Sequence, residues 1–206
     1  MQTDRELMNA GQLYNSNDSE LIALRRAAKQ KIYQYNQTHP EQQDVRQHLL
    51  DELLDCPSAD PFIEVPTRMD YGYNVHIGKR FYANYDSIFL DIAPIVIGNN
   101  VMLGPRVSLY TAGHPIVPDI RNQDLEYGHP ITIGNDVWIG GNAVICPGVT
   151  IGNNVVIGAG TIVTKDIPDN SVAVGNPGHV IRQITAADQA FWENEKSQYL
   201  KRRGIN

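Results

Sequence analysis

A six-residue period of hydrophobic and polar positions governs the middle of the chain. From residue 131 the sequence divides into ITIGND, VWIGGN, AVICPG, VTIGNN, VVIGAG and TIVTKD. The third position is always aliphatic, the first usually is, and the fourth is nearly always small. The third-position residues are Ile133, Ile139, Ile145, Ile151, Ile157 and Val163. Upstream, IVIGNN, VMLGPR and VSLYTA keep the same phase, and VHIGKR, FYANYD and SIFLDI show a fainter version offset by two residues.

A period of six predicts strands, because it is a multiple of the strand period of two and does not fit the helical period of about 3.6. Each hexad is expected to form one short strand with its third residue pointing inward. A glycine or polar turn follows, where a positive φ is often needed. Three strands close a triangular coil, and stacked coils bury a continuous aliphatic column. An ordinary β-sandwich has turns every 8–12 residues or so and does not explain a strict six.

The first sixty residues lack the hexads and predict helices. In NDSELIALRRAAKQKIYQYNQ, Asn17 and Glu20 have the spacing of a capping box. The apolar positions that follow recur at three and four, which indicates one buried helix face. They are Leu21, Leu24, Ala28 and Ile32.

The segment THPEQQDVRQHLLDELLD repeats this arrangement. Thr38 and Glu41 again have capping-box spacing, and Pro40 suits a first helical turn. The predicted apolar stripe consists of Val45, Leu49 and Leu53. We expect the two helices to pack as a small cap on the coil.

Residues 110–130 interrupt the period. Leu109 ends the upstream hexads, and Ile131 resumes them in phase. Ordered connections of this length are usually functional, and a smooth β-helix has no pocket of its own, so we expect this loop to protrude. His114 stands at its start. Taken alone, a histidine in a Gly-His-Pro turn is more often structural or solvated than catalytic, but histidine as a residue type can act as a base near neutral pH.

The bulk composition narrows the partners and the compartment. The formal net charge of −6 argues against general nucleic-acid binding, which needs a basic surface. Cys56 and Cys146 make neither a disulfide framework nor a metal-ligand spacing, so we expect two reduced thiols in a cytoplasmic protein. The start of the chain lacks the pattern of a signal peptide. No apolar run approaches the roughly 18 residues of a transmembrane helix, so no membrane association is expected.

Several longer motifs are more specific than the hexads. They are AGQLY at 10–14, DYGYN at 70–74, FYANYD at 81–86, TAGHP at 111–115, EYGHPITIGNDVWIGG at 126–141 and VIGAGTIVTKDIPDNSVAVGNPGHVIRQI at 156–184. Over nearly the whole chain they resemble the maltose and galactoside O-acetyltransferases, which are hexapeptide-repeat acyltransferases. The resemblance implies a mainly β fold, a left-handed parallel β-helix, whose hand departs from the usual crossover rule. The expected division is an N-terminal helical cap (1–58), a β-helix with the protruding loop (59–183) and a C-terminal helical tail (184–206).

The resemblance also implies the reaction, transfer of an acetyl group from acetyl-CoA to a sugar hydroxyl. His114 matches the general base, the N–H of Gly141 matches the donor to the oxyanion, and Asn84 is expected to hold the reacting hydroxyl. No Ser-His or Cys-His nucleophile motif is apparent, which favours direct attack in a ternary complex. Cys146 occupies a fourth position and is interpreted as a packed turn residue. Acetyl-CoA is a co-substrate, and neither a permanently bound cofactor nor a metal is expected.

Binding residues follow from the same match. Those on the acceptor side are Asp70, Tyr82, Asn84 and Asp91, with Asp18 as a further candidate that could equally cap a helix. Those on the coenzyme side are Trp138, Gly141, Ala159, Thr164, Lys165, His179 and Arg182. His179 stands where the galactoside enzymes carry arginine, which predicts a weaker phosphate contact. The outward-facing Trp138 could flank the pantetheine arm or cover a subunit contact.

Three alternatives and an assembly complete the expectations. The acceptor could be serine or an antibiotic instead of a sugar. A γ-type carbonic anhydrase would use His76, His114 and His129, although its short His-x-x-x-x-His pair is absent. A non-enzymatic scaffold would have no need of His114. Outward apolar positions such as Tyr110, Trp138 and Val156 predict a homotrimer with a site in each cleft, and the C-terminal segment is expected to cover the end of the coil.

Overall fold

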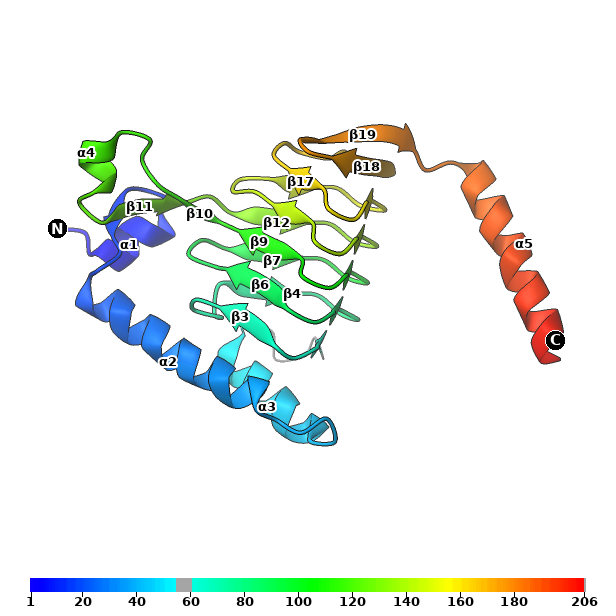
Figure 1. The fold of residues 1–206 in the computed structure, drawn as a ribbon, viewed down its shortest axis with the longest axis horizontal. Helices are drawn as coiled ribbons and strands as arrows, with labels where there is room; N and C mark the ends of the chain where they lie inside the picture. The colour runs from blue at the N-terminus through cyan, green and yellow to red at the C-terminus, as the bar shows by residue number, and fades with distance from the viewer. Residues whose placement is uncertain (55–60, 206) are drawn as a thin grey trace.

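The computed structural model describes residues 1–54 and 61–205, and most of these residues form a triangular prism (Figure 1). Each face is a sheet, and the chain visits the three faces in turn. The seven-strand face contains β2 (Phe62–Ile63), β5 (Tyr82–Ala83), β8 (Met102–Leu103), β13 (Trp138–Ile139), β16 (Val156–Ile157), β18 (Ser171–Gly175) and β19 (Gly178–Gln183). The five-strand face contains β3 (Thr67–Met69), β6 (Ser87–Leu90), β9 (Ser108–Tyr110), β14 (Val144–Ile145) and β17 (Ile162–Val163). The four-strand face contains β4 (Val75–Ile77), β7 (Ile95–Ile97), β12 (Ile131–Ile133) and β15 (Thr150–Ile151).

The predicted period and its inward-facing column are confirmed. Thr132 pairs in parallel with Thr150, three hexads further along the chain. All six third-position residues from Ile133 to Val163 are at most 1% exposed. Burying one aliphatic side chain of this size stabilises a fold by about 1.5–3 kcal/mol, so the column supplies a large part of the driving force for coiling.

The small fourth position has a different cause from the one expected. The positive φ angles lie at the sixth position of the hexad, as in Asp136 (57°), Asn142 (60°) and Asn154 (53°). The fourth-position glycines instead allow the coils to stack. A Cβ added at Gly140 would lie 2.6 Å from the backbone nitrogen of Ala159 in the next coil. Close approach between coils therefore selects the small residue.

The N-terminal segment forms the expected cap. It consists of α1 (Asp4–Asn9), β1 (Tyr14–Asn15), α2 (Ser19–Asn36) and α3 (Gln43–Leu53). Ile32, Tyr35 and Leu50 belong to the same buried cluster as the coil interior. The helices therefore close the end of the aliphatic column that begins at β2.

Both predicted helix starts are wrong in detail. The N-cap of α2 is Asp18, not Asn17, and its carboxylate accepts the N–H groups of Glu20 (3.0 Å) and Leu21 (3.2 Å). At α3 the expected box of Thr38 and Glu41 does not form, because the helix begins at Gln43, after Gln42, without a side-chain cap.

The buried stripe of α3 is also rotated by one residue. It contains Arg46, Leu50 and Leu53, whereas Val45 is 45% exposed. The Thr38 hydroxyl donates to the carbonyl oxygen of Tyr35 and accepts from Nε of Arg46, both at 2.7 Å. These bonds serve the turn between the helices and leave Thr38 outside α3.

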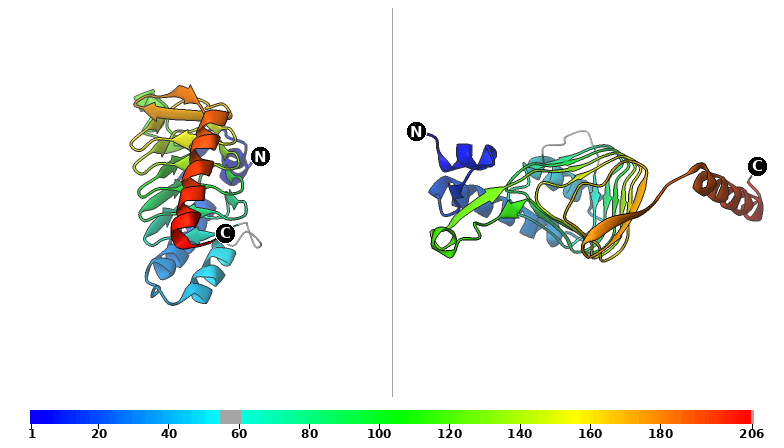
Figure 2. Two further views of the ribbon diagram at one scale, coloured as in Figure 1. Left: turned by 90° about the vertical axis from the view of Figure 1, so that its right-hand side faces the viewer. Right: turned by 90° about the horizontal axis from the view of Figure 1, so that it is seen from above.

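The interruption at 110–130 protrudes as an arm (Figure 2). It contains β10 (Ala112–Gly113), α4 (Pro118–Arg121) and β11 (Leu125–Gly128), and β11 pairs antiparallel with both β10 and β1. Ile131 re-enters the coil opposite Ile95, which lies 36 residues earlier. The next coil, from Thr132 to Thr150, takes only 18 residues. The arm thus lengthens one coil without changing the stacking.

The C-terminal segment does not cover the end of the coil, so that expectation is wrong. The antiparallel pair β18–β19 lies at that end, and α5 (Ala186–Arg203) stands away from the prism in both Figure 1 and Figure 2. No residue of α5 is buried, and Phe191 and Trp192 are 57% and 67% exposed. No helix in residues 1–54 and 61–205 is long and apolar enough to span a membrane. The predicted boundary at 58/59 and Cys56 lie outside the described residues.

Candidate active site

One edge of the prism carries three of the predicted site residues. Here the chain passes from the seven-strand face to the five-strand face, and Asn84, Gly141 and Ala159 lie in the turns after β5, β13 and β16. We call it the Gly141 edge. Gly141 is half-buried, and its carbonyl oxygen accepts the N–H of Gly160 at 2.9 Å. Its own N–H has no acceptor among the described residues.

A second edge carries another group of predicted residues. It lies where the chain passes from the five-strand face to the four-strand face, and we call it the His114 edge. Asp70 follows β3, Asp91 follows β6, the arm with His114 follows β9, and Thr164 and Lys165 follow β17. Both edges were assembled from residues far apart in the sequence by the stacking of the coils.

The five-strand face separates the two edges. Its strand β6 spans Ser87–Leu90, four residues, which at about 3.3 Å per residue is roughly 13 Å. A general base must lie within about 3 Å of the atom that loses its proton. A single chain therefore brings His114 together with neither Asn84 nor Gly141.

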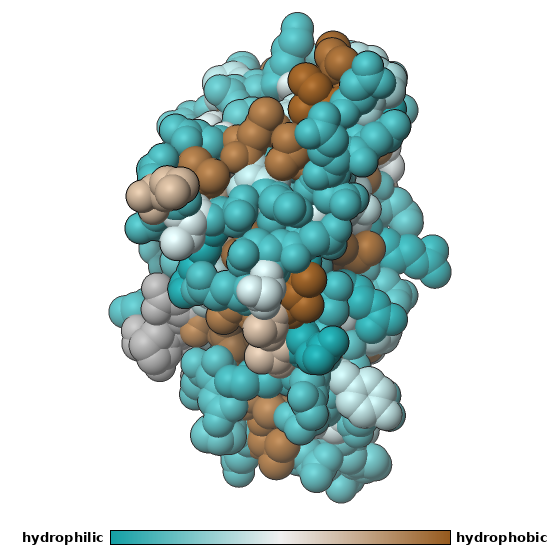
Figure 3. All heavy atoms as spheres, turned by 90° about the vertical axis from the view of Figure 1, so that its left-hand side faces the viewer, coloured by the Kyte–Doolittle hydropathy of each residue, from teal (hydrophilic) through white to brown (hydrophobic). Residues whose placement is uncertain are grey.

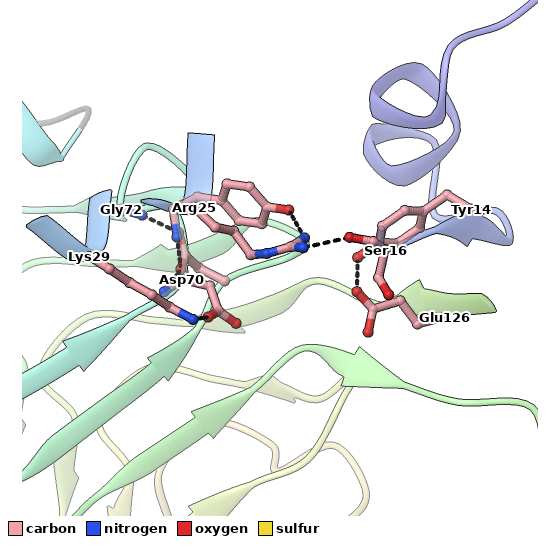
Figure 4. A network of polar contacts seen from close by, with 9 residues as sticks. Tyr14, Ser16, Arg25, Lys29, Asp70, Gly72 and Glu126 are labelled. Atoms are coloured by element: carbon pink, nitrogen blue, oxygen red, sulfur yellow. Dashed lines mark hydrogen bonds and ion pairs between the residues drawn. The ribbon is translucent and has the colours of Figure 1, made fainter. Parts of the chain in front are cut away.

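The side chain of His114 faces a carboxylate on the returning strand of the arm. Its Nε2 lies 3.8 Å from Oε2 of Glu126, and the two side chains are 55% and 14% exposed. The phenol of Tyr14, in the cap, donates a hydrogen bond to Oε1 of the same Glu126 (Figure 4). Neither Glu126 nor Tyr14 was predicted from the sequence as a site residue. Each lies within a quoted motif, EYGHP or AGQLY, but the pairing of β1 with β11 had no local signal.

Arginine and lysine side chains of α2 hold the base of this region together (Figure 4). Arg25 donates to the hydroxyl of Tyr71 (2.8 Å) and to the carbonyl oxygen of Ser16 (2.5 Å). Lys29 lies 3.5 Å from the carboxylate of Asp70. These contacts tie the cap to the turn after β3, next to the arm.

Asp91 is a structural residue here, which corrects its predicted role as an acceptor contact. It is fully buried, and its carboxylate accepts the N–H groups of Asp70 (2.9 Å), Tyr71 (2.9 Å) and Gly72 (2.6 Å). Burial raises the pKa of Asp91 to about 6, although these N–H donors oppose the shift. With no exposed surface, the carboxylate cannot meet a sugar.

The remaining acceptor candidates are less enclosed. Asp18 serves as the N-cap of α2, which is the helix-capping role that the sequence offered as the alternative to an acceptor contact. Tyr82 is half-buried on the seven-strand face and stacks on Phe62 with ring centroids 5.9 Å apart. Asn84 is half-buried, and its side-chain oxygen accepts the N–H of Tyr85 at 2.8 Å, which leaves its amide group free to donate.

A hollow of about 840 Å³ lies between α2 and the five-strand face, beside Asp70. Lys29, Asp70 and Arg68 provide its charged groups, and Ile88 and Leu90 provide part of its apolar wall. A mostly apolar wall with a few charged groups is the usual composition of a small-molecule site. The hollow adjoins the His114 edge.

Coenzyme-side candidates gather around two smaller hollows. Thr164, Lys165 and His179 line one of about 370 Å³. Trp138 and Arg182 line the other, of about 430 Å³. Nη1 of Arg182 is 2.9 Å from a carboxylate oxygen of Asp188, the residue that also closes the capping box of α5. The exposed Ala159 stands on the Gly141 edge, apart from these linings.

Two further groups bear on other chemistries. Burial raises the pKa of the Cys146 thiol, which disfavours the thiolate form and agrees with a packed turn residue. Of the three histidines considered for zinc, His76 lies on β4 whereas His114 and His129 belong to the arm segment. Within the described residues, no three His, Cys, Asp or Glu side chains form a group that could hold a metal.

Comparison with known proteins decides the family. Residues 7–56 match the maltose acetyltransferase hexapeptide capping motif, and residues 130–165 match the bacterial transferase hexapeptide repeats. A maltose O-acetyltransferase structure from Clostridium difficile 630 is 48% identical, with a TM-score of 0.86, over 89% of this chain and 98% of that chain. The chain belongs to the maltose and galactoside O-acetyltransferase family. The predicted left-handed parallel β-helix and the predicted family are thus confirmed.

Two further relatives extend the likeness. A putative acetyltransferase of Dictyostelium discoideum is 50% identical over 182 residues, 88% of this chain and 95% of the relative. A galactoside acetyltransferase in complex with coenzyme A is 42% identical, with a TM-score of 0.88, over 92% of this chain and 94% of that chain. The protein is accordingly an acyltransferase, in line with the prediction.

Proposed function

We propose that the protein transfers an acetyl group from acetyl-CoA to a hydroxyl of a sugar, with His114 as the general base. The observation that carries this proposal is the half-exposed imidazole of His114 beside the Glu126 carboxylate, on an arm that projects from the coil of an acetyltransferase. A relative solved with coenzyme A supports the donor. The names of the maltose and galactoside relatives support a sugar acceptor.

The proposed step joins the acceptor oxygen directly to the thioester carbonyl carbon. His114 takes the hydroxyl proton as the C–O bond forms, which a weakly acidic sugar hydroxyl requires. The N–H of Gly141, which lacks an acceptor in the described residues, stabilises the oxyanion of the tetrahedral intermediate. The C–S bond then breaks, and the imidazolium returns its proton to the leaving thiolate. Glu126 stabilises the positive charge on His114 between the two transfers.

Two copies of the chain would share each site. Because roughly 13 Å of the five-strand face separates the His114 edge from the Gly141 edge, the His114 edge of one copy must meet the Gly141 edge of the next. A ring of three such contacts closes the assembly as a homotrimer. Exposed apolar side chains support a covered interface, with Trp138 and Met102 52% and 51% exposed on the seven-strand face and Ile116 90% exposed on the arm.

Figure 3 looks onto the arm and the cap and shows a largely hydrophilic surface with separate hydrophobic groups. Such a surface suits reversible entry of a polar acceptor next to the arm. The hollow beside Asp70 would receive the acceptor, while Thr164, Lys165, His179 and Arg182 would bind the coenzyme. The proposed acceptor contacts remain Asp70, Tyr82 and Asn84. The thioester end of the coenzyme would be flanked by Trp138, Gly141 and Ala159.

A thiol-release assay tests the proposal. Purified protein with acetyl-CoA should release free thiol only when a sugar such as maltose, glucose or a galactoside is added. His114→Ala should lower this rate by about 10²–10⁴. His48→Ala is the matched control, because that exposed histidine also faces a carboxylate, Glu52, at 3.1 Å but lies on α3. Thiol release with serine or an antibiotic, and with no sugar, would show that the acceptor is not a sugar. Full activity of His114→Ala would show that His114 is not the general base.

A further inference from the structure

One contact between the helical cap and the proposed active site joins two side chains directly beside His114. Strand β1 pairs antiparallel with β11 of the arm, and Tyr14 lies directly opposite Glu126. The strands are short, with two residues in β1 and four in β11. Ser16, next to β1, also donates to the carbonyl oxygen of Asp124 from its N–H (3.1 Å) and its hydroxyl (3.2 Å). The Tyr14–Glu126 bond adds a side-chain contact to these backbone attachments.

Tyr14 is built into the cap and not into the arm. It is 1% exposed and packs with Met8, Leu21 and Ile92 in a cluster separate from the main column. Burial, together with the carboxylate of Glu126, raises the pKa of Tyr14. The phenol thus remains protonated and acts as a hydrogen-bond donor at all physiological pH values.

Glu126 is consequently held at one oxygen and exposed to the base at the other. Tyr14 donates to Oε1, and Oε2 faces Nε2 of His114 at 3.8 Å. A carboxylate fixed by a charge-assisted hydrogen bond keeps a defined orientation. Without the phenol O–H, the terminal torsion of a glutamate is broad, and the carboxylate would spend less time beside His114.

We infer that Tyr14 is a positioning residue, which holds the Glu126 carboxylate beside His114 and so lets the cap set the turnover of the site. The inference rests on the proposed role of His114. Its consequence is that the cap contributes to catalysis as well as closing the coil.

Tyr14→Phe tests this, because it removes only the hydroxyl and keeps the buried ring. We expect kcat to fall about 3- to 30-fold, less than on removal of a general base, with both KM values within about twofold of wild type. Tyr35→Phe is the matched control. Tyr35 is also 1% exposed in the cap, and its hydroxyl donates to the carbonyl oxygen of Ile63 at 2.5 Å, in the main buried cluster. It should lose comparable stability and keep its kcat.

A double-mutant cycle separates positioning from a general weakening of the fold. Glu126→Gln should itself lower kcat, and Tyr14→Phe added to it should change kcat by less than about twofold, because Tyr14 acts only through the carboxylate. A folded Tyr14→Phe protein with wild-type kcat, or effects that multiply in the double variant, would overturn the inference.

A structural readout keeps this inference separate from the proposed function. If the wild-type protein moved no acetyl group to a sugar, the proposed function would fail, and crystal structures would still decide the role of Tyr14. In Tyr14→Phe the Glu126 carboxylate should turn away from His114, whereas in Tyr35→Phe it should stay. An unchanged Glu126 in Tyr14→Phe would overturn the inference irrespective of activity.

Discussion

Subunit mixing tests whether each site is shared between copies. One chain carries His114→Ala and keeps the Gly141 edge, and the other carries Asn84→Ala and keeps the His114 edge. Alone, each should retain at most about 1% of wild-type turnover, given the usual effects of losing a base or a polar group that stabilises the transition state. The five-strand face is about 13 Å wide, several times the reach of a proton transfer, so the two residues of one chain cannot compensate for each other.

In a ring of three, any combination of the two chains contains one contact where an intact His114 edge meets an intact Gly141 edge. Mixed rings should therefore regain about one third of wild-type activity per ring. Co-expression with two different affinity tags, followed by tandem purification, isolates only mixed rings. Light scattering should give about three times the 23.0 kDa chain mass.

The control mixes His114→Ala chains with chains that carry both substitutions, which leaves no intact contact and should leave activity near 1% or below. Mixed rings of the first kind that stayed at this level would refute the shared site. An active species of monomer mass would refute the trimer as well, because then one chain must complete its own site.

Three further predictions concern the coenzyme side and stability. Lys165→Ala and Arg182→Ala should mainly raise KM for acetyl-CoA, because both charges lie remote from the thioester; a change confined to the acceptor KM would place the coenzyme elsewhere. The pKa of buried Asp91 is raised from 3.8 to about 6, so the folded protein binds this proton more tightly than the unfolded chain does. The contribution of Asp91 to the free energy of unfolding is therefore full below about pH 4 and falls by about 3 kcal/mol as pH rises past 6. Urea unfolding across this range should show the component in wild type and not in Asp91→Asn, and equal pH dependence in both would contradict the assignment. Gly140→Ala should lower stability by about 1–3 kcal/mol, since its Cβ would lie 2.6 Å from the next coil; a wild-type unfolding midpoint would show that the coils can separate at no cost.

The sequence alone determined the coil and much of the cap. Each hexad contains one strand and the turn that follows it, and its third residue must be buried in every coil. The local pattern therefore specified both the period of the coil and the register of its strands. The motif around His114 and the resumption of phase at Ile131 likewise predicted the protruding arm. The local pattern did not determine the start of α2, because Asn17 and Asp18 are both good N-caps; the structure has Asp18 in that position.

Tertiary structure decided what the local pattern could not encode. The pairing of Tyr14 with Glu126 joins residues 112 positions apart, and nothing in either short strand indicates its partner. Asp91 was predicted from the sequence as an acceptor contact, but the turn after β3 covers it, and its carboxylate accepts three N–H groups. The separation of the His114 and Gly141 edges follows from closing the coil into a prism. This separation is the basis for the proposal that each active site needs residues from two chains. All three features depend on long-range contacts, whose partners are set by the packing of the whole chain and not by neighbours in the sequence.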